Sequence, residues 1–191
     1  TTPGGTDVVD WTDNALSESM TQTGLSLSAG QTYYVSVRAE NGVGLFSTGV
    51  SDGITIDISA PSAPGAVNDG LDSDMEFAGS TTELTANWMA SSDSESGIYR
   101  YWHAIGSAPG GADIVGWTDN GDLLTVTHSG LALIEGQTYY FTVRAENGAG
   151  LLSTATNSDG QTVDTSSPTD VATVNDGPGA DIDWTTSSSS L

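Results

Sequence analysis

Apolar and polar residues alternate along several short stretches of the chain, which is the pattern of half-buried β-strands. The clearest stretch is Thr138–Glu146, where every second residue from Tyr139 to Ala145 is apolar or aromatic. No stretch has the 3.6-residue period of an amphipathic helix, so the sequence predicts an all-β fold. Further strands are predicted at 84–88, 99–105, around 114–117, around 124–128, and from 152 to about 163 with an interruption at 157–160.

The same alternation predicts which side chains lie in the core. Trp88 is expected there, because it follows Leu84 and Ala86 at period two. His103 falls on a predicted core face, where we interpret it as a hydrogen-bonded structural histidine. The residues sharing that face are Tyr99, Tyr101 and Ile105, and those on the opposite face are Arg100, Trp102 and Ala104.

The chain contains an internal repeat. Residues 1–48 align without a gap to residues 107–154, with 28 identical positions among the 48 pairs. After one inserted residue the similarity continues, and it pairs Asp57 with Asp164 and Pro61 with Pro168. A unit of about 106 residues has the size of a whole domain, because solenoid repeats run about 20 to 50 residues.

The repeat divides the chain into one whole unit and two partial ones. We expect residues 61–167 to form a complete domain. Residues 1–60 correspond to the later part of a preceding domain, and residues 168–191 correspond to the start of a following one. Two explanations stay open: the chain is a window from a longer array, or neighbouring copies supply the missing strands and build a head-to-tail filament.

Three features of the complete unit stand together. Residues 133–139 place a Leu and a Gly turn before a Tyr, residues 143–150 run from a strand into an Asn-Gly-x-Gly loop, and Trp88 stands in a predicted core strand. Together they resemble the fibronectin type III family of β-sandwiches, in which the Tyr hydroxyl of a tyrosine corner returns to the backbone. The resemblance implies sheets ABE and C′CFG, with strands C′, E, F and G in residues 1–60 and strand A with the start of B in residues 168–191. It assigns structural roles to Trp88, Tyr139 and Tyr33.

Charge and composition exclude several classes of function. There are 25 Asp and Glu residues against 3 Arg and no Lys, which gives a net charge of −22. Such a chain does not bind nucleic acid through its own charge, and no apolar run is long enough to span a bilayer. Without Cys there is no disulfide and no thiol nucleophile. The acidic turn regions are similar to bacterial surface repeats, which favours a secreted or cell-surface location.

The acidic residues do not predict an enzyme. Catalytic carboxylate pairs need a desolvated cleft, whereas most of these acids stand in turn sequences such as Asp52-Gly53 and Asp159-Gly160. A Gly-rich segment at 42–47 precedes a strand rather than a helix, so it does not fit a phosphate loop.

Calcium is the best chemical hypothesis, because clustered carboxylates and amides supply the oxygen ligands that this ion prefers. In a fibronectin-like tandem, the end of one domain approaches the B–C and F–G loops of the next. This arrangement predicts a junction site formed by Asp57, Asp93, Glu95 and Asn147. The alternative is a solvated, self-repelling acidic surface without a metal.

An outward aromatic patch allows another class of function. Trp102 and Tyr140 are predicted on the outer face of adjacent strands, with Arg100 and Arg144 near them. Such a patch could bind a glycan or a neighbouring chain, or it could consist of cross-strand and cation–π contacts that cover the sheet.

We therefore expect a non-enzymatic structural or adhesive segment of an extracellular tandem-repeat protein, acting as a stalk, spacer or filament component. Its expected partners are neighbouring copies of the repeat. The alternative is a carbohydrate-binding accessory module of a secreted hydrolase.

Overall fold

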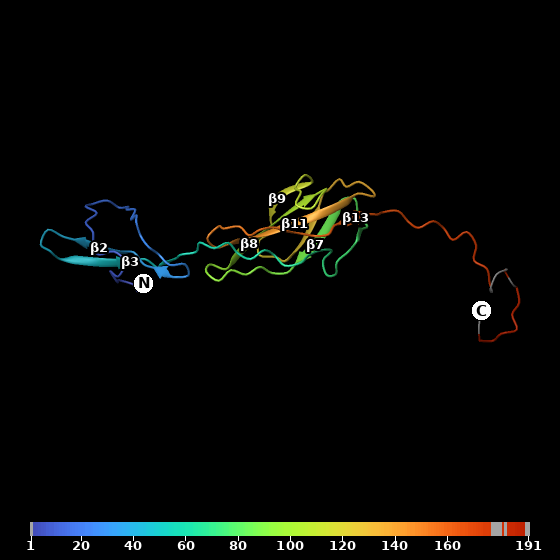
Figure 1. Cartoon of the computed structure of the whole chain (residues 1–191), viewed down its shortest axis with the longest axis horizontal. Coiled ribbons are helices and arrows are strands. Elements are labelled where there is room, and N and C mark those ends of the chain that lie inside the picture. The colour runs from blue at the N-terminus through green and yellow to red at the C-terminus, as the bar shows by residue number, and fades with distance from the viewer. Residues whose placement is uncertain (1, 177–180, 182, 190–191) are drawn as a thin grey trace.

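The structure is a computed structural model that describes residues 2–176, 181 and 183–189. All regular elements within these residues are β-strands. None of the described segments is a helix with the length and apolar character needed to cross a membrane. Figure 1 shows β2 and β3 at one end of the chain, a group of strands from β7 to β13 in the middle, and residues 168–176 leading away from that group toward the other end.

The middle group is a sandwich of two sheets. One sheet has the strand order β10-β7-β5, and the other has the order β6-β13-β11-β8-β9, with β12 also paired to β11. These orders correspond to the predicted sheets ABE and C′CFG, so the all-β, fibronectin type III-like fold is confirmed. The strands are β5 (Val67–Asp69), β6 (Phe77–Ala78), β7 (Glu83–Trp88), β8 (Ile98–Gly106), β9 (Val115–Asp119), β10 (Thr125–Ser129), β11 (Thr138–Asn147), β12 (Thr156–Asn157) and β13 (Gln161–Val163).

The core lies between these sheets and follows the period-two pattern. Strand β11 contributes the alternate residues Tyr139, Phe141, Val143 and Ala145, all of them buried. Trp88 is also buried and packs against Tyr101 with the ring centroids 5.9 Å apart. The remaining buried apolar residues are Val67, Ala78, Leu84, Ala86, Ile105, Val126, Leu133 and Val163.

Two details of the sandwich correct the predictions. Tyr99 was predicted in the core but is exposed, because it lies at the start of β8, where the pairing with β11 shifts register between Glu146 and Asn147. The parallel pairing of β6 with β13 was not predicted. The predicted interruption near 157–160 does separate β12 from β13.

Residues 2–60 form two small two-stranded sheets in place of a sandwich. Strand β2 (Ser36–Glu40) pairs with β3 (Phe46–Val50), and β1 (Thr32–Tyr33) pairs with β4 (Ile54–Thr55). These are the counterparts of strands F and G. The predicted strands C′ and E do not form in this segment, because a strand needs a hydrogen-bonded neighbour, and their neighbours in the sandwich are C and B.

The last segment was predicted to supply strand A and the start of B. Its described residues contain no strand, and Val171, Val174 and Trp184 are exposed. Residues 177–180, 182, 190 and 191, on which part of that prediction falls, lie outside the described residues.

Candidate functional site

The predicted junction residues converge where the first segment enters the sandwich. Asp57 lies two residues after the end of β4 and reaches two loops of the following unit. Its Oδ2 atom accepts a hydrogen bond from the Asn147 amide nitrogen at 2.8 Å and another from the Ser96 hydroxyl. The C-terminal end of one unit is thereby attached to the loops of the next.

Asn147 is the centre of this junction and is fully buried. Its Oδ1 atom accepts the backbone N–H groups of Ala149 at 3.1 Å and Leu151 at 2.8 Å, which close the turn after β11. The amide nitrogen must therefore face the junction. There it donates to three oxygens: Asp57 Oδ2, the Ser59 carbonyl at 3.0 Å and Asp93 Oδ2 at 3.1 Å.

This orientation changes the predicted role of Asn147. The sequence interpretation included its side chain among the oxygen ligands of a calcium ion. In the structure the amide oxygen is used by the turn, and the side chain contributes N–H donors that draw two carboxylates together.

Asp93 is held by its own loop. Its Oδ1 atom accepts the backbone N–H groups of Glu95 at 3.2 Å, Ser96 at 2.9 Å and Gly97 at 3.1 Å. The pKa of Asp93 is lower than its ordinary value. The largest cause is the hydrogen bond from the Ser96 backbone, and the second is the hydrogen bond from the Asn147 side chain. One oxygen from each of Asp57, Asp93 and Glu95 lies within 4.8 Å of the other two. Three carboxylates at this spacing form a donor set that suits a hard divalent cation.

A second carboxylate cluster was not predicted. Oxygens of Asp69, Asp74 and Asp159 also lie within 4.8 Å of one another. Asp69 is fully buried, and it accepts hydrogen bonds from the Gly160 backbone at 2.9 Å and the Gln161 side chain at 3.1 Å. Burial raises the pKa of Asp69 to about 6, although these hydrogen bonds oppose the shift. The Asp-Gly sequences had indicated only turns, because nothing local in them signals a buried carboxylate.

The predicted outward patch is a network of paired groups. Arg100 forms ion pairs with Asp119 at 2.6 Å and Glu146 at 3.3 Å. The indole N–H of Trp102 donates to the same Glu146 at 2.6 Å. The Arg100 guanidinium also lies 4.4 Å from the Tyr99 ring centroid. These contacts match the alternative in which cross-strand and cation–π interactions cover the sheet.

Tyr140 lies apart from this network. Arg144 is the residue opposite Trp102, whereas Tyr140 is opposite Gly106, four residues and therefore about 13 Å farther along the strand. The Arg144 guanidinium lies 4.0 Å from the ring centroid of Trp117, a residue that was not predicted to belong to the patch. A sugar that stacked on Trp117 from that side would have to displace Arg144.

The structural residues occupy their predicted positions. The Tyr139 hydroxyl accepts the backbone N–H of Ile134 at 3.0 Å, which is the contact of a tyrosine corner. The Tyr33 hydroxyl accepts the backbone N–H of Ser28 at the same distance. His103 is buried, and its Nε2 atom lies 3.2 Å from Nδ1 of His128. Burial, with a smaller contribution from His128, lowers the pKa of His103 to about 4.

Comparison with known proteins gives likenesses in structure alone. No family model matches the chain, and no curated protein matches it. A crystal structure of titin domains is 22% identical, covers 72% of this chain and 43% of its own length, and superposes with a TM-score of 0.49. A titin module from human cardiac muscle is 24% identical, covers 53% of this chain and 91% of its own length, with a TM-score of 0.37.

A third solved structure is the fibronectin type III domain of human fibronectin type III domain containing protein 3. It is 23% identical and covers 58% of this chain and 94% of its own length, with a TM-score of 0.35. The chain spans about two fifths of the first titin structure. The strand order of the two sheets is what defines the fibronectin type III-like fold here.

Proposed function

We propose that the chain is a structural segment of an extracellular or cell-surface tandem-repeat protein, in which it acts as a stalk, spacer or filament component. The observation that carries the proposal is the hydrogen-bonded junction at Asn147. A passive linker needs no specific contacts, whereas here one buried amide of the second unit holds two acceptors at the end of the first, the Asp57 carboxylate and the Ser59 carbonyl. Such a junction sets the spacing and angle between successive units.

The charge supports the same role. An excess of 22 negative charges keeps a long array extended and soluble, because like charges along it repel one another. The three arginines are already counted in this excess, and one of them, Arg100, is paired with two carboxylates of its own sheet.

The junction can be tested by NMR relaxation of the backbone amides of residues 57–60. In the wild-type chain we expect order parameters typical of rigid backbone, about 0.85, and in Asn147→Ala values below about 0.6. Asn41→Ala is the matched control, because Asn41 closes the equivalent turn by accepting the N–H groups of Val43 and Leu45. Flexible residues 57–60 in the wild-type chain would contradict the proposal.

A second proposal concerns calcium at this junction, and it is supported by the convergence of Asp57, Asp93 and Glu95. A bound ion would neutralise these carboxylates and stiffen the junction further. At a free concentration of 100 times its Kd, an ion that binds only the folded state stabilises it by about 2.7 kcal/mol. We expect a higher melting temperature in millimolar calcium than in chelator, and no such difference in Asp93→Asn. An unchanged melting temperature in the wild-type chain excludes the ion.

A further inference from the structure

The buried histidine of the sandwich has one ring nitrogen with a partner and one without. His103 is 2% exposed, and its Nε2 atom lies 3.2 Å from Nδ1 of His128. The Nδ1 atom of His103 is shielded from solvent and has no hydrogen-bond partner among the described residues. Most buried polar atoms are hydrogen-bonded, so an exception of this kind requires an explanation.

The contact between the two histidines crosses from one sheet to the other, because His103 belongs to β8 and His128 belongs to β10. The imidazole rings meet edge to face, with their centroids 5.4 Å apart. His128 is partly exposed, so protons from solvent reach its ring more readily than they reach His103. A change of protonation at His128 therefore acts directly on a side chain in the core.

When both imidazoles are neutral, the contact allows two arrangements, since each ring has one N–H donor and one acceptor nitrogen. In the first arrangement, His103 Nε2 donates to His128 Nδ1, and His103 Nδ1 is an acceptor without a partner. In the second, donor and acceptor are reversed, and His103 Nδ1 carries an N–H group without a partner. The first arrangement is favoured, because buried N–H donors without partners are the rarer case.

Protonation of His128 leaves only the second arrangement. Both nitrogens of an imidazolium ion are donors, so His128 Nδ1 must donate and His103 Nε2 must accept. His103 can accept while it stays neutral if its own proton moves to Nδ1. Burial, with a smaller contribution from the charge of His128, lowers the pKa of His103 to about 4. His103 therefore stays neutral over most of the range in which an ordinary histidine titrates.

The lack of a partner at Nδ1 is what permits this exchange. A carbonyl oxygen at that atom would hold a proton there, and an N–H donor would exclude one, so either group would fix one tautomer of His103. The residues opposite His103 are Val143 of β11 and Thr118 of β9. Valine has no polar side-chain atom, and the Thr118 hydroxyl donates to the Gly116 carbonyl at 2.9 Å.

The other charged residues of the surrounding strands do not face this pair. On β7, Glu83 is exposed and precedes Leu84, which is the residue opposite His128. The charged residues of β8, β9 and β11 lie on the outer face of their sheet, namely Arg100, Asp119, Arg144 and Glu146. Protonation of His128 is therefore the event to which His103 responds.

We propose that the two histidines form a reversible hydrogen bond, which joins the two sheets in both protonation states of His128. At neutral and alkaline pH His103 is the donor, and in mild acid His128 becomes the donor. This device lies inside one unit, so it goes beyond the proposed function and does not depend on how successive units are joined.

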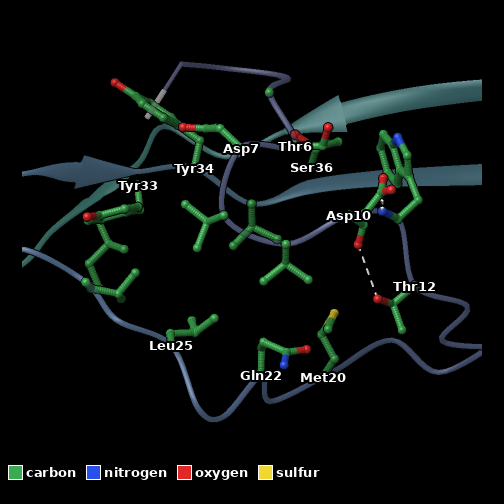
Figure 2. A pocket seen from close by; sticks show the side chains of 17 residues that line it. Thr6, Asp7, Asp10, Thr12, Met20, Gln22, Leu25, Tyr33, Tyr34 and Ser36 are labelled. Atoms are coloured by element: carbon green, nitrogen blue, oxygen red, sulfur yellow. Dashed lines mark hydrogen bonds between the residues drawn. The ribbon is translucent and has the colours of Figure 1, made fainter.

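The internal repeat supplies a matched control. The counterpart of His128 is Gln22, which Figure 2 shows beside Met20 on the wall of a pocket in the first segment. A glutamine side chain has a carbonyl acceptor and does not titrate, so it can accept from His103 Nε2 at every pH. His128→Gln should therefore keep the hydrogen bond and remove its reversal.

The direct test is long-range ¹H–¹⁵N NMR of the imidazole rings in the complete chain, from about pH 8 to about pH 5. In the wild-type chain, the proton of His103 should move from Nε2 to Nδ1 as His128 becomes protonated. In His128→Gln it should stay on Nε2 throughout. The proposal is overturned by an unchanged tautomer of His103 in the wild-type chain, by uptake of a second proton at His103 in this range, or by the same change in His128→Gln.

The hydrogen bond itself can be observed as a scalar coupling between the two nitrogens that share the proton, His103 Nε2 and His128 Nδ1. We expect the coupling at both ends of the pH range, with the proton bonded to His103 at about pH 8 and to His128 at about pH 5. Loss of the coupling in acid would mean that protonation separates the rings, and would contradict a bond that is present in both states.

Discussion

Residues 32–40 and 138–146 have nearly the same sequence but different surroundings. Seven of these nine positions are identical, yet Val37 is 64% exposed and Val143 is fully buried. The second copy lies between two other strands, whereas the first has a neighbour on one side. Alternation of apolar residues thus specifies which face of a strand is to be covered, and partner strands decide whether that face is covered.

Short-range contacts are the same in both copies. The tyrosine-corner hydrogen bond is 3.0 Å in each, and the hydroxyl pairs Thr32 with Thr55 and Thr138 with Thr162 are both 2.8 Å. These contacts join residues of one pair of strands or one corner, so they need no strand from elsewhere. The sequence of each copy is therefore enough to form these local hydrogen bonds, whereas burial of the side chains requires the whole sandwich.

The largest difference between the copies should appear on truncation of the central core residue. We expect Phe141→Ala to lower the free energy of unfolding by about 3 to 5 kcal/mol, because it removes a fully buried ring and leaves a cavity. The counterpart Val35→Ala should change it by less than about 0.5 kcal/mol, since Val35 is exposed. Denaturant unfolding measures both changes. A similar loss of stability in the two variants would show that Val35 is packed in a core as Phe141 is, and would contradict the comparison.

The pair of histidines offers a test by pH, since the first copy has Gln22 in place of His128. The pKa of buried His103 is lowered to about 4, so between about pH 6.5 and 4 the unfolded chain binds a proton that the folded chain does not. Stability from this group is complete above pH 6.5 and decreases as the pH falls, by about 3 kcal/mol in all. His103→Phe should remove this loss in unfolding measured from pH 7 to pH 4. An unchanged pH profile would contradict the assignment.

Asp69 should act in the opposite direction over nearly the same range. Its pKa is raised to about 6 by burial, so between about pH 4 and 6 the folded chain holds a proton that the unfolded chain has released. Stability from this group is therefore lost as the pH rises, by about 3 kcal/mol. Asp69→Asn should remove this dependence of the unfolding free energy on pH, so that only the opposite dependence caused by His103 remains. Its exposed counterpart in the last segment provides the control Asp176→Asn, which should change stability by less than about 0.5 kcal/mol.

The smallest expected effect concerns one turn. Gly121 has φ of +59° and its counterpart Ala15 has φ of +51°, a conformation that costs an L-residue with a side chain about 1 kcal/mol or more. Gly121→Ala should thus destabilise the sandwich by about 1 kcal/mol in denaturant unfolding. Ala15→Gly should have no destabilising effect, and a loss of stability in that variant would contradict the strain at Ala15.

Much of the sandwich could be predicted because its signals are local. The alternation in Thr138–Glu146 identified β11 to within one residue, and Trp88 was placed in the core by its spacing from Leu84. Strand β6 was missed, since two residues in parallel pairing carry no period. Tyr99 was placed wrongly, because a register shift at the end of β11 is a property of two strands together.

The junction was predicted in part for a similar reason. The order of strands in a tandem placed Asp57, Asp93, Glu95 and Asn147 near one another, and the structure brings them together. The direction of the Asn147 amide was not predictable, because it depends on which backbone N–H groups the turn leaves open. The burial of Asp69 could not be predicted, because the residues around it in the sequence give no sign of it. Its hydrogen-bond partners Gly160 and Gln161 are more than 90 residues away along the chain.

The buried amide of Asn147 also has a consequence for the chemical ageing of the protein. An Asn followed by Gly is prone to deamidate, since the glycine nitrogen can attack the amide carbon when the backbone is free to bend. In the sandwich that nitrogen donates to the Gly97 carbonyl at 3.2 Å, and the Asn147 amide is held at both ends. Loss of the amide would replace N–H donors by a further carboxylate beside Asp57 and Asp93. The exposed Asn41 of the Asn41-Gly42 sequence should therefore deamidate before Asn147 does. The junction contacts protect the Asn147 amide from deamidation, the reaction that would weaken the junction.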